Sequence, residues 1–294
     1  MTSTSTVADP FDVKVDRLCR SSRRAFESPY DTFDWPDEVD ADAWYTSPEL
    51  VTIHGAGVWD DLDGSERRRL AFFEAVNFYS LNIHGERSLM QGLAARLYRR
   101  DTGPISPYLH HFLAEENNHS IWFGRFCTTY AGKVYPERKV TFAETERLPG
   151  EEDFLFFAKV LIFEEIADGF NQLMARDERL APLARRINLH HHRDESRHLV
   201  FGRAMTARLF ATHAPSWPAG RLEAIRRYLA AYLAATWREY YNPSAYRDAG
   251  LADPWRLAEQ AWDRPGGRLL RRRMSDKCIQ HLLAVGILEK EPEL

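Results

Sequence analysis

The stretch that decides the fold reads HHHRDESRH and occupies residues 190–198. It lies within a segment, residues 180–213, where apolar residues recur with the period of an α-helix. On the apolar face of that helix stand His191, Glu195 and His198, at positions i, i+4 and i+7. Three side chains that can bind metal therefore point inward over two turns. The alternative is a chance cluster of polar residues on an exposed helix. It does not explain why one of three consecutive histidines lies on the inward face together with a further glutamate and histidine.

A second helical segment, residues 104–131, carries a related signature. Its inward face is apolar except for Glu116 and His119, which stand three residues apart and therefore lie side by side. One Glu-x-x-His pair is weak support for a metal site, because the two residues often have this spacing on solvated helix faces. The pair therefore indicates a metal site only in combination with the other helices.

Two more helical segments each place an acid among apolar residues. Over residues 65–100 the inward face contains Glu86 as its single charged member. A buried carboxylate is costly unless its charge is compensated, and one found alone is most often salt-bridged or protonated. Over residues 151–178 two neighbours, Glu164 and Glu165, each fall on a plausible inward face. Periodicity alone leaves the choice between them open.

Taken together, the four segments offer Glu, Glu-x-x-His, Glu and Glu-x-x-His. This is the ligand pattern of ferritin-like di-iron and di-manganese bundles, and it predicts an all-α, ferritin-like four-helix bundle. Four carboxylates neutralise two divalent ions, which removes the cost of burying the charges. A single zinc ion fits less well, because it needs three or four ligands and the chain has no HExxH motif.

Two acids next to expected ligands are candidates for holding the histidines. Asp194 precedes Glu195, and Glu115 precedes Glu116. Since a ligating histidine usually donates its other ring N–H to a carboxylate, we expect Asp194 to hold His119 and Glu115 to hold His198 across the bundle. We expect Arg197 to join the same network.

Composition narrows the classes of protein to consider. The chain has 294 residues, of which 44% are hydrophobic and 28% charged, so it is not globally disordered. A net charge of −4 gives no basic footprint for nucleic acid and no polybasic membrane patch. Its three cysteines are far apart, which argues against disulfide and zinc scaffolds. With no secretory signal and no long apolar run, we expect a cytoplasmic protein that does not span a membrane.

The pattern of elements predicts two parts, an arm and irregular segment over residues 1–64 and a bundle domain over residues 65–294. In the first part we expect a loosely held arm with a short helix at 13–26 and an extended piece at 50–54. In the second, Ser65 resembles an N-cap, residues 134–141 could be extended, and further helices are expected at 218–241, 254–262 and 266–287. These C-terminal helices either pack on the bundle or form a contact in a homodimer.

The motif Asp194-Glu195-Ser196-Arg197-His198 looks like the DExRH signature of oxygen-activating di-iron proteins. With the added His191 four residues before Glu195, the chain resembles the aminobenzoate N-oxygenase family, the AurF-like arylamine oxygenases. The resemblance implies a di-iron site of four glutamates and three histidines. It maps these ligands onto Glu86, Glu116, His119, Glu164, His191, Glu195 and His198. Glu164 is preferred to Glu165 because the family places this glutamate about 27 residues before the extra histidine.

The resemblance also implies the chemistry. We expect two iron ions, O₂ as co-substrate and an external electron donor. The expected substrate is a small-molecule amine, and more specifically an arylamine, that is oxygenated towards hydroxylamine, nitroso or nitro products in secondary metabolism such as antibiotic biosynthesis. Manganese in one site stays open. Two alternatives also stay open: a di-iron hydroxylase or desaturase that acts on carbon, and a ferritin-like metal-binding protein without catalysis, although storage proteins of that kind are usually shorter.

Overall fold

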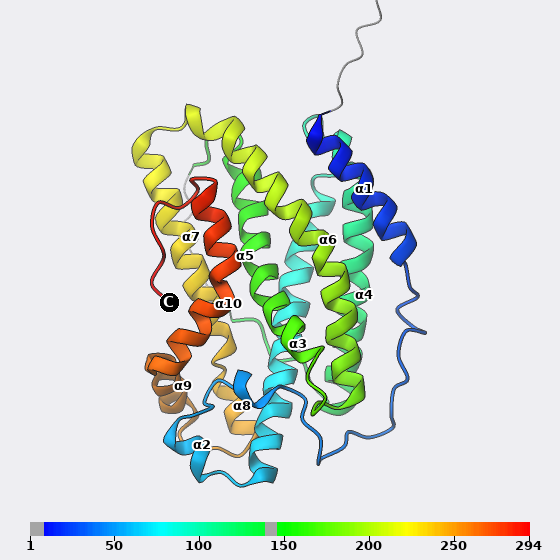
Figure 1. Cartoon of the computed structure of the whole chain (residues 1–294), viewed down its shortest axis with the longest axis vertical. Coiled ribbons are helices and arrows are strands. Elements are labelled where there is room, and N and C mark those ends of the chain that lie inside the picture. Colours follow the sequence, from blue (N-terminus) through cyan, green and yellow to red (C-terminus); the bar gives the residue numbers. More distant parts are fainter. Residues whose placement is uncertain (1–8, 139–145) are drawn as a thin grey trace, which may run out of the picture.

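Four long helices form the centre of the molecule. We describe the chain from a computed structural model, which describes residues 9–138 and 146–294. The central helices are α3 (Gly64–Ala94), α4 (Ser106–Tyr130), α5 (Glu151–Met174) and α6 (Pro182–His213). Helix α3 packs along α4 and α5 packs along α6, as Figure 1 shows. The predicted all-α, ferritin-like fold is confirmed.

The start of α3 lies slightly earlier than the sequence predicts. Its N-cap is Asp63, whose carboxylate accepts a hydrogen bond from the Glu66 backbone N–H at 2.8 Å. The Glu66 side chain in turn accepts from the Asp63 N–H at 2.9 Å, which completes a capping box. Ser65 was therefore the wrong choice for the cap. An acid that caps two residues upstream satisfies two N–H groups at once, and a serine inside the first turn does not.

The first helix, α1 (Pro10–Ala25), is longer and better packed than predicted. It begins after Asp9, whose side chain accepts from the Phe11 N–H at 2.9 Å. Its inner face buries Val15, Leu18 and Cys19 against α4 and α6. Figure 1 shows α1 lying across the outer edge of these two helices. The expectation of a loosely held arm is therefore wrong for this helix, since its apolar stripe is covered.

The irregular segment before α3 contains only short helical pieces. These are a 3₁₀ helix, η1 (Pro48–Leu50), and α2 (Gly57–Asp61). Residues 50–54 form turns, so the extended piece expected there is wrong. In the described part of the chain the only β-pairing is a single bridge between Trp44 and Leu180. Residues 134–138 form no strand, and the rest of the segment expected to be extended lies outside the described residues.

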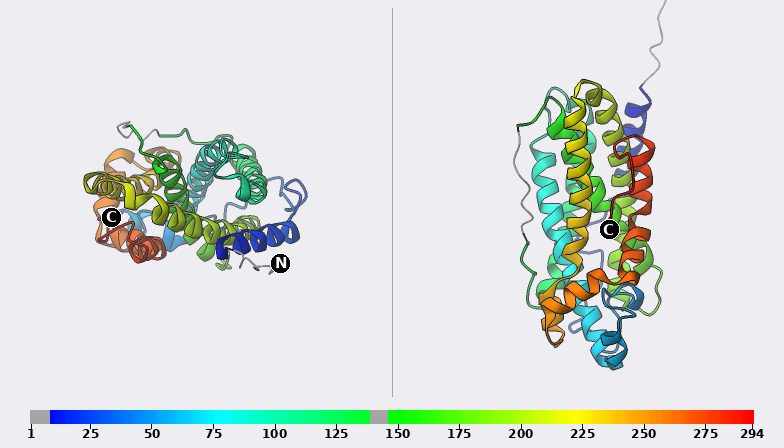
Figure 2. Two further views of the ribbon diagram at one scale, coloured as in Figure 1. Left: turned by 90° about the horizontal axis from the view of Figure 1, so that it is seen from above. Right: turned by 90° about the vertical axis from the view of Figure 1, so that its left-hand side faces the viewer.

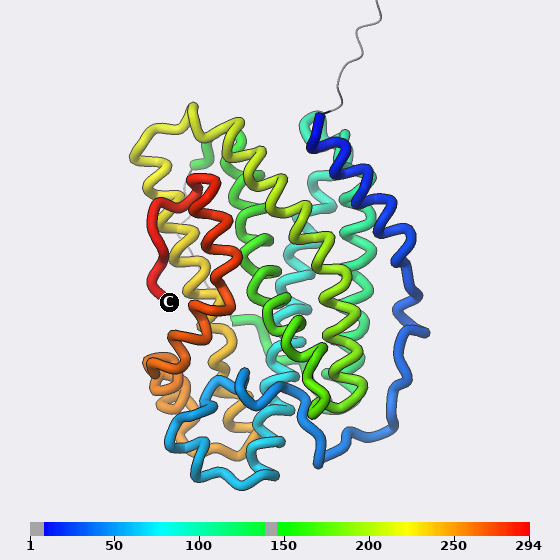
Figure 3. Tube along the Cα trace, viewed as in Figure 1, coloured from blue at the N-terminus to red at the C-terminus, as the bar shows by residue number. Residues whose placement is uncertain are grey.

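The C-terminal helices cover the opposite side of the bundle. Helices α7 (Ala219–Tyr240) and α10 (Pro265–Ala284) pack against α5, while α8 (Pro243–Asp248) packs against α3 and α9 (Pro254–Asp263) links α8 to α10. The views in Figures 2 and 3 show α1 and the α7–α10 unit on opposite sides of the four central helices. Among the described helices, none combines the length and apolar character needed to cross a membrane.

The core of the bundle is divided by a polar layer. On one side lie aromatic and aliphatic residues such as Tyr79, Phe123 and Phe170, and on the other side a second apolar cluster that includes Phe112 and Phe201. On each central helix the apolar stripe is interrupted at the same level by acids or histidines. This layer contains the candidate site.

Candidate metal centre

The four central helices bring all seven expected ligands into one buried layer. None of the seven is more than 2% exposed. Their ligand atoms form two groups, and within each group the atoms lie within 4.8 Å of one another. The first group is Glu86, His119 and His191, and the second is Glu116, Glu164, Glu195 and His198.

Two of the glutamates lie between the groups. Glu195 Oε1 is 2.9 Å from His191 Nε2 and 3.8 Å from His119 Nδ1, while its Oε2 is 3.4 Å from His198 Nδ1. Glu116 Oε1 is 2.8 Å from His198 Nδ1 and 3.7 Å from His119 Nδ1. These two carboxylates therefore contact histidines of both groups, as ligands shared between two ions would.

Several inward-facing polar atoms lack a hydrogen-bond partner among the described residues. They are one or more oxygens of Glu86, Glu116, Glu164 and Glu195 and the Nδ1 atoms of His119 and His198. Buried polar atoms are normally satisfied, and each exception calls for an explanation. For Glu164 both oxygens are without a partner. Hard oxygen and imidazole donors left open toward a common space fit a pair of divalent metal ions.

The electrostatics of the protein alone show how unfavourable this layer is without cations. Burial, together with the neighbouring Glu116 carboxylate, raises the pKa of Glu86 well above its ordinary value. Burial and the nearby Glu195 do the same to the pKa of Glu164. Burial alone would lower the pKa of His119, but the surrounding carboxylates, with Glu116 first, raise it well above the ordinary value. Two divalent ions would remove this competition for protons.

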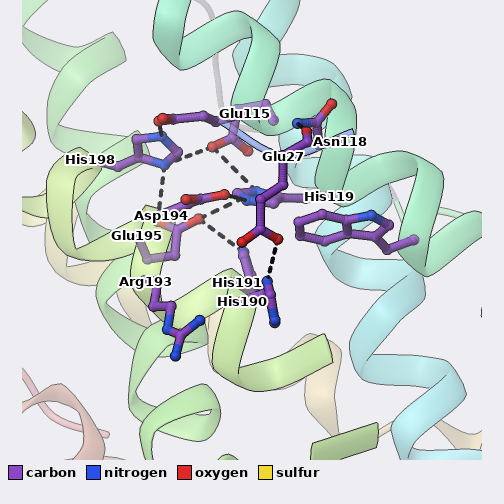
Figure 4. A network of polar contacts seen from close by, with 12 residues as sticks. Glu27, Glu115, Asn118, His119, His190, His191, Arg193, Asp194, Glu195 and His198 are labelled. Atoms are coloured by element: carbon purple, nitrogen blue, oxygen red, sulfur yellow. Dashed lines mark hydrogen bonds and ion pairs between the residues drawn. The ribbon is translucent and has the colours of Figure 1, made fainter. Parts of the chain in front are cut away.

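The outer nitrogens of two histidines meet acids. His119 Nε2 lies 3.2 Å from Asp194 Oδ2, and His198 Nε2 lies 2.8 Å from Glu115 Oε2. Both contacts join residues that the sequence pairs across the bundle, and Figure 4 shows the four residues close together. The Arg197 guanidinium donates to Glu115 at 2.6 Å and also to Asp194, so one cation ties the two acids together.

The third histidine has a neutral partner. His191 Nδ1 lies 2.7 Å from the side-chain amide of Asn171, which stands seven residues, or two helical turns, after Glu164 on α5. The hydroxyl of Ser120 donates to Glu86 Oε2 at 2.9 Å. The sequence pattern singles out neither Asn171 nor Ser120, which stands directly after His119. Short polar side chains next to ligands carry no periodic signal that would single them out.

The structure separates the two candidate glutamates of α5. Glu164 faces the layer, whereas Glu165 accepts from the Arg203 side chain at 2.6 Å on another face of the helix. Two buried aromatic residues also contact the candidate ligands. Phe112 stacks on His198 with 3.9 Å between ring centroids, and Trp122 lies 5.5 Å from His119.

A cavity of about 460 Å³ lies between α3, α5 and α7, and residues of all three helices line it. It is lined by Gly85 and Phe163, the residues next to Glu86 and Glu164 in the sequence. The Phe163 ring lies directly on Gly85: a Cβ atom there would be 2.3 Å from the ring. The ring therefore fills the space between the two helices at the level of the ligands.

The same cavity has aromatic walls and cationic groups. Arg138 pairs with Glu239, while Arg147 pairs with Glu151. Lys159 forms no ion pair with any described residue, and its ammonium lies 5.9 Å from the centre of a tyrosine ring on α7. Burial and the nearby Arg147 lower the pKa of Lys159.

Comparison with known proteins decides the family. The sequence matches the family described as "P-aminobenzoate N-oxygenase AurF" over residues 12–286. The chain belongs to this family. Because the match covers nearly the whole chain, the AurF family includes both α1 and the C-terminal helices. Family and ligand geometry together identify a di-metal oxidase or oxygenase scaffold.

Solved structures support the fold. Two variants of an R2-like ligand-binding oxidase with a reconstituted Mn/Fe cofactor each align with a TM-score of 0.51 and 16% identity. Each alignment covers 97% of this chain and 95% of the other. At this identity the likeness concerns the fold. A comparison with curated proteins gave no match.

Proposed function

We propose that this AurF-family protein is an O₂-dependent di-iron N-oxygenase whose substrate is an arylamine. The observation that carries the proposal is the convergence of four glutamates and three histidines in one buried layer. Glu86, His119 and His191 would hold one iron ion, and Glu164 and His198 the other. Glu116 and Glu195, which lie between the groups, would be shared.

When bound, two iron ions supply Lewis acidity and the electrons that reduce O₂. The protein contributes position and environment. Asp194 and Glu115 orient the imidazoles of His119 and His198, so that their Nδ1 atoms face the centre. The apolar clusters on both sides of the layer exclude water from the site.

The cavity beside α3 and α5 is the site where we place the substrate. Its volume of about 460 Å³ is in the range of small-molecule pockets. Aromatic walls suit an aromatic ring, and the unpaired Lys159 ammonium suits an acid on that ring. For the amine to reach the metals, the Phe163 ring must turn away from Gly85. The proposed substrate is thus an arylamine that bears an acidic group, such as the p-aminobenzoate of the family's description.

The test is product analysis on the iron-loaded protein. We would supply reductant, ¹⁸O₂ and p-aminobenzoate, and measure bound metals and products by mass spectrometry. The expected product carries ¹⁸O on nitrogen, with two irons per chain. Label on carbon instead would overturn the N-oxygenase and favour a carbon hydroxylase, and a large iron mineral without product would favour storage.

Two variants test the placement of the substrate. Lys159→Met should raise the KM for p-aminobenzoate about tenfold and change the KM for aniline, which has no acid, by less than twofold, because only the first substrate loses a charged partner. Phe163→Ala should lower the KM for bulky arylamines, since the ring no longer closes the passage. Equal effects of Lys159→Met on both substrates would exclude the assigned role of the ammonium.

A further inference from the structure

One face of the molecule carries five exposed arginines although the whole chain has a net charge of −4. On α1 the side chains of Arg17, Arg20, Arg23 and Arg24 are exposed, and so is Arg193 on the neighbouring α6. None of these five forms an ion pair with a described residue. Arg17, Arg20 and Arg24 lie opposite the buried face of α1, so their guanidinium groups point to solvent. Two arginines in the last turn would suffice to complement the helix dipole, so a longer stripe indicates a further role.

A second cavity opens beside this basic face. Its volume is about 210 Å³, and it lies between the end of α1, α4 and α6. Arg193 and Glu27 line its mouth, with Glu27 held by His190 at 2.9 Å. Phe26, which also lines the cavity, is 70% exposed, and Tyr30, four residues further along the chain, is 69% exposed. A basic rim around exposed aromatic rings is typical of a protein interface.

The inner wall of this cavity reaches the candidate metal centre through single contacts. Asp194 and Trp122 both line it, and both touch the imidazole of His119. Glu115, also in the wall, touches His198. Figure 4 shows Asp194 beside His119 and Glu115 beside His198.

We propose that this face, which we call the α1 face and define as Arg17, Arg20, Arg23, Arg24 and Arg193 with the cavity beside them, is the docking site of an acidic one-electron carrier protein. The inference rests on the proposed oxygenase function, which consumes electrons from outside the chain. Each docking transfers one electron from the reduced carrier to the bound metal pair, so two dockings return both ions from the trivalent to the divalent state. No atom is transferred.

Charge complementarity selects the partner. Five unpaired arginines attract an acidic surface and speed its encounter. Asp194 and Trp122 lie in the cavity wall and contact His119, so an electron carrier bound at this face would be separated from the candidate ligand by a single residue. Nucleic acid would also be attracted to arginines, but the cavity and its contacts with the ligands would then have no use.

The experiment compares two charge-reversal variants of the full-length, metal-loaded protein. One is Arg20→Glu/Arg24→Glu on the α1 face. The control is Arg268→Glu/Arg273→Glu on α10, which makes the same charge change at exposed residues on the far side of the molecule. The probe is a plant-type [2Fe–2S] ferredoxin, whose binding is measured by calorimetry at low and moderate ionic strength. Stopped-flow absorbance under anaerobic conditions measures how fast the reduced ferredoxin reduces the oxidised centre.

We expect the α1 variant to weaken ferredoxin binding and slow reduction by about tenfold or more at low ionic strength, with a shallower dependence on salt. The control should stay within twofold. Equal weakening of ferredoxin binding in both variants, or no weakening in the α1 variant, would overturn the proposal. It would also be overturned if the α1 variant lost binding to a DNA duplex while its ferredoxin binding stayed unchanged. If the protein fails to bind ferredoxin and still oxidises the amine when a chemical reductant supplies the electrons, that result would overturn only this inference, and the proposed function would stand.

Discussion

Replacing Asp194 with asparagine tests how the centre is held. The Asp194 carboxylate lies 3.2 Å from His119 Nε2 and is fixed by Arg197. Burial opposes its charge, but the hydrogen bond with His119 and the charges around it lower the pKa of Asp194 below its usual range, so the group acts as an anion. An anion there holds the imidazole proton on Nε2 and leaves Nδ1 free for metal. Asparagine keeps the shape and removes the charge.

The size of the effect follows from this contact. Loss of an outer partner of a ligating histidine typically costs 10–100-fold in metal affinity, about 1.4–2.7 kcal/mol. At 3.2 Å the bond to His119 is longer than the 2.8 Å bond between His198 and Glu115. We therefore expect Asp194→Asn to weaken binding by about 10-fold and Glu115→Gln to reach the upper part of the range.

The assay is anaerobic titration of Fe(II) against a competing chelator, with circular dichroism to verify folding. A matched control is Asp168→Asn, another buried acid that contacts a histidine, His192, outside the candidate ligands. Its metal affinity should stay within twofold of the parent. If Asp194→Asn binds iron as tightly as the parent, or no more weakly than the control, the assigned role of the carboxylate is refuted.

Three further outcomes can be measured on the purified protein. Gly85→Ala should lower stability by about 1–3 kcal/mol in urea unfolding, because its Cβ meets the Phe163 ring, while Gly124→Ala, where nothing lies within 4 Å, should not. Burial raises the pKa of Glu74 to about 8 although Thr52 donates two hydrogen bonds to it, so the folded carboxyl keeps a proton that the unfolded one loses. Stability should therefore fall as pH rises from about 5 to 8, and Glu74→Gln should flatten this slope. Removal of metal by a chelator should lower the Tm by several degrees, read by calorimetry, since the buried carboxylates lose their counter-charge.

The arrangement of the ligands could be predicted because it depends on helical periodicity. An acid or histidine within an apolar stripe must face inward, so Glu86, Glu116 and His191 could be placed from spacing alone. The choice between Glu164 and Glu165 could not, because both lie on apolar faces of a helix that is buried on most sides. The choice depends on Arg203, a cation on a different helix, which donates a hydrogen bond to Glu165 and so holds it away from the candidate site.

Features that depend on contacts between distant segments could not be predicted from the sequence. Neighbouring elements decide that residues 50–54 turn rather than extend, and that α1 lies firmly on α4 and α6. The helix termini were also displaced. The sequence predicts a helix to residue 100, whereas α3 ends at Ala94. Beyond Ala94 the chain forms turns instead, in which Tyr98 takes a positive φ of 56° and the Arg96 carbonyl accepts a hydrogen bond from the Thr102 hydroxyl.

The outer partners of the three histidines give the centre an asymmetry. His119 and His198 contact carboxylates, whereas His191 contacts the amide of Asn171. A carboxylate partner makes an imidazole a stronger donor than a neutral amide does, so His191 is the weakest of the three. Its Nε2 faces Glu195, and metal bound there requires the proton on Nδ1. That proton needs an acceptor, which the Asn171 Oδ1 supplies when the amide is turned by half a rotation.

In the present orientation Asn171 directs its Nδ2, not its Oδ1, at His191 Nδ1, so the amide must turn to meet this requirement. Its Oδ1 is buried and has no hydrogen-bond partner among the described residues, so turning the amide costs no existing bond at that atom. The site can therefore hold His191 in two proton arrangements without moving its helix. With metal bound, His191 would be the imidazole whose bond to the metal could change while the carboxylates and the other two histidines hold the ions, and this would distinguish it from the six ligands of the wider pattern.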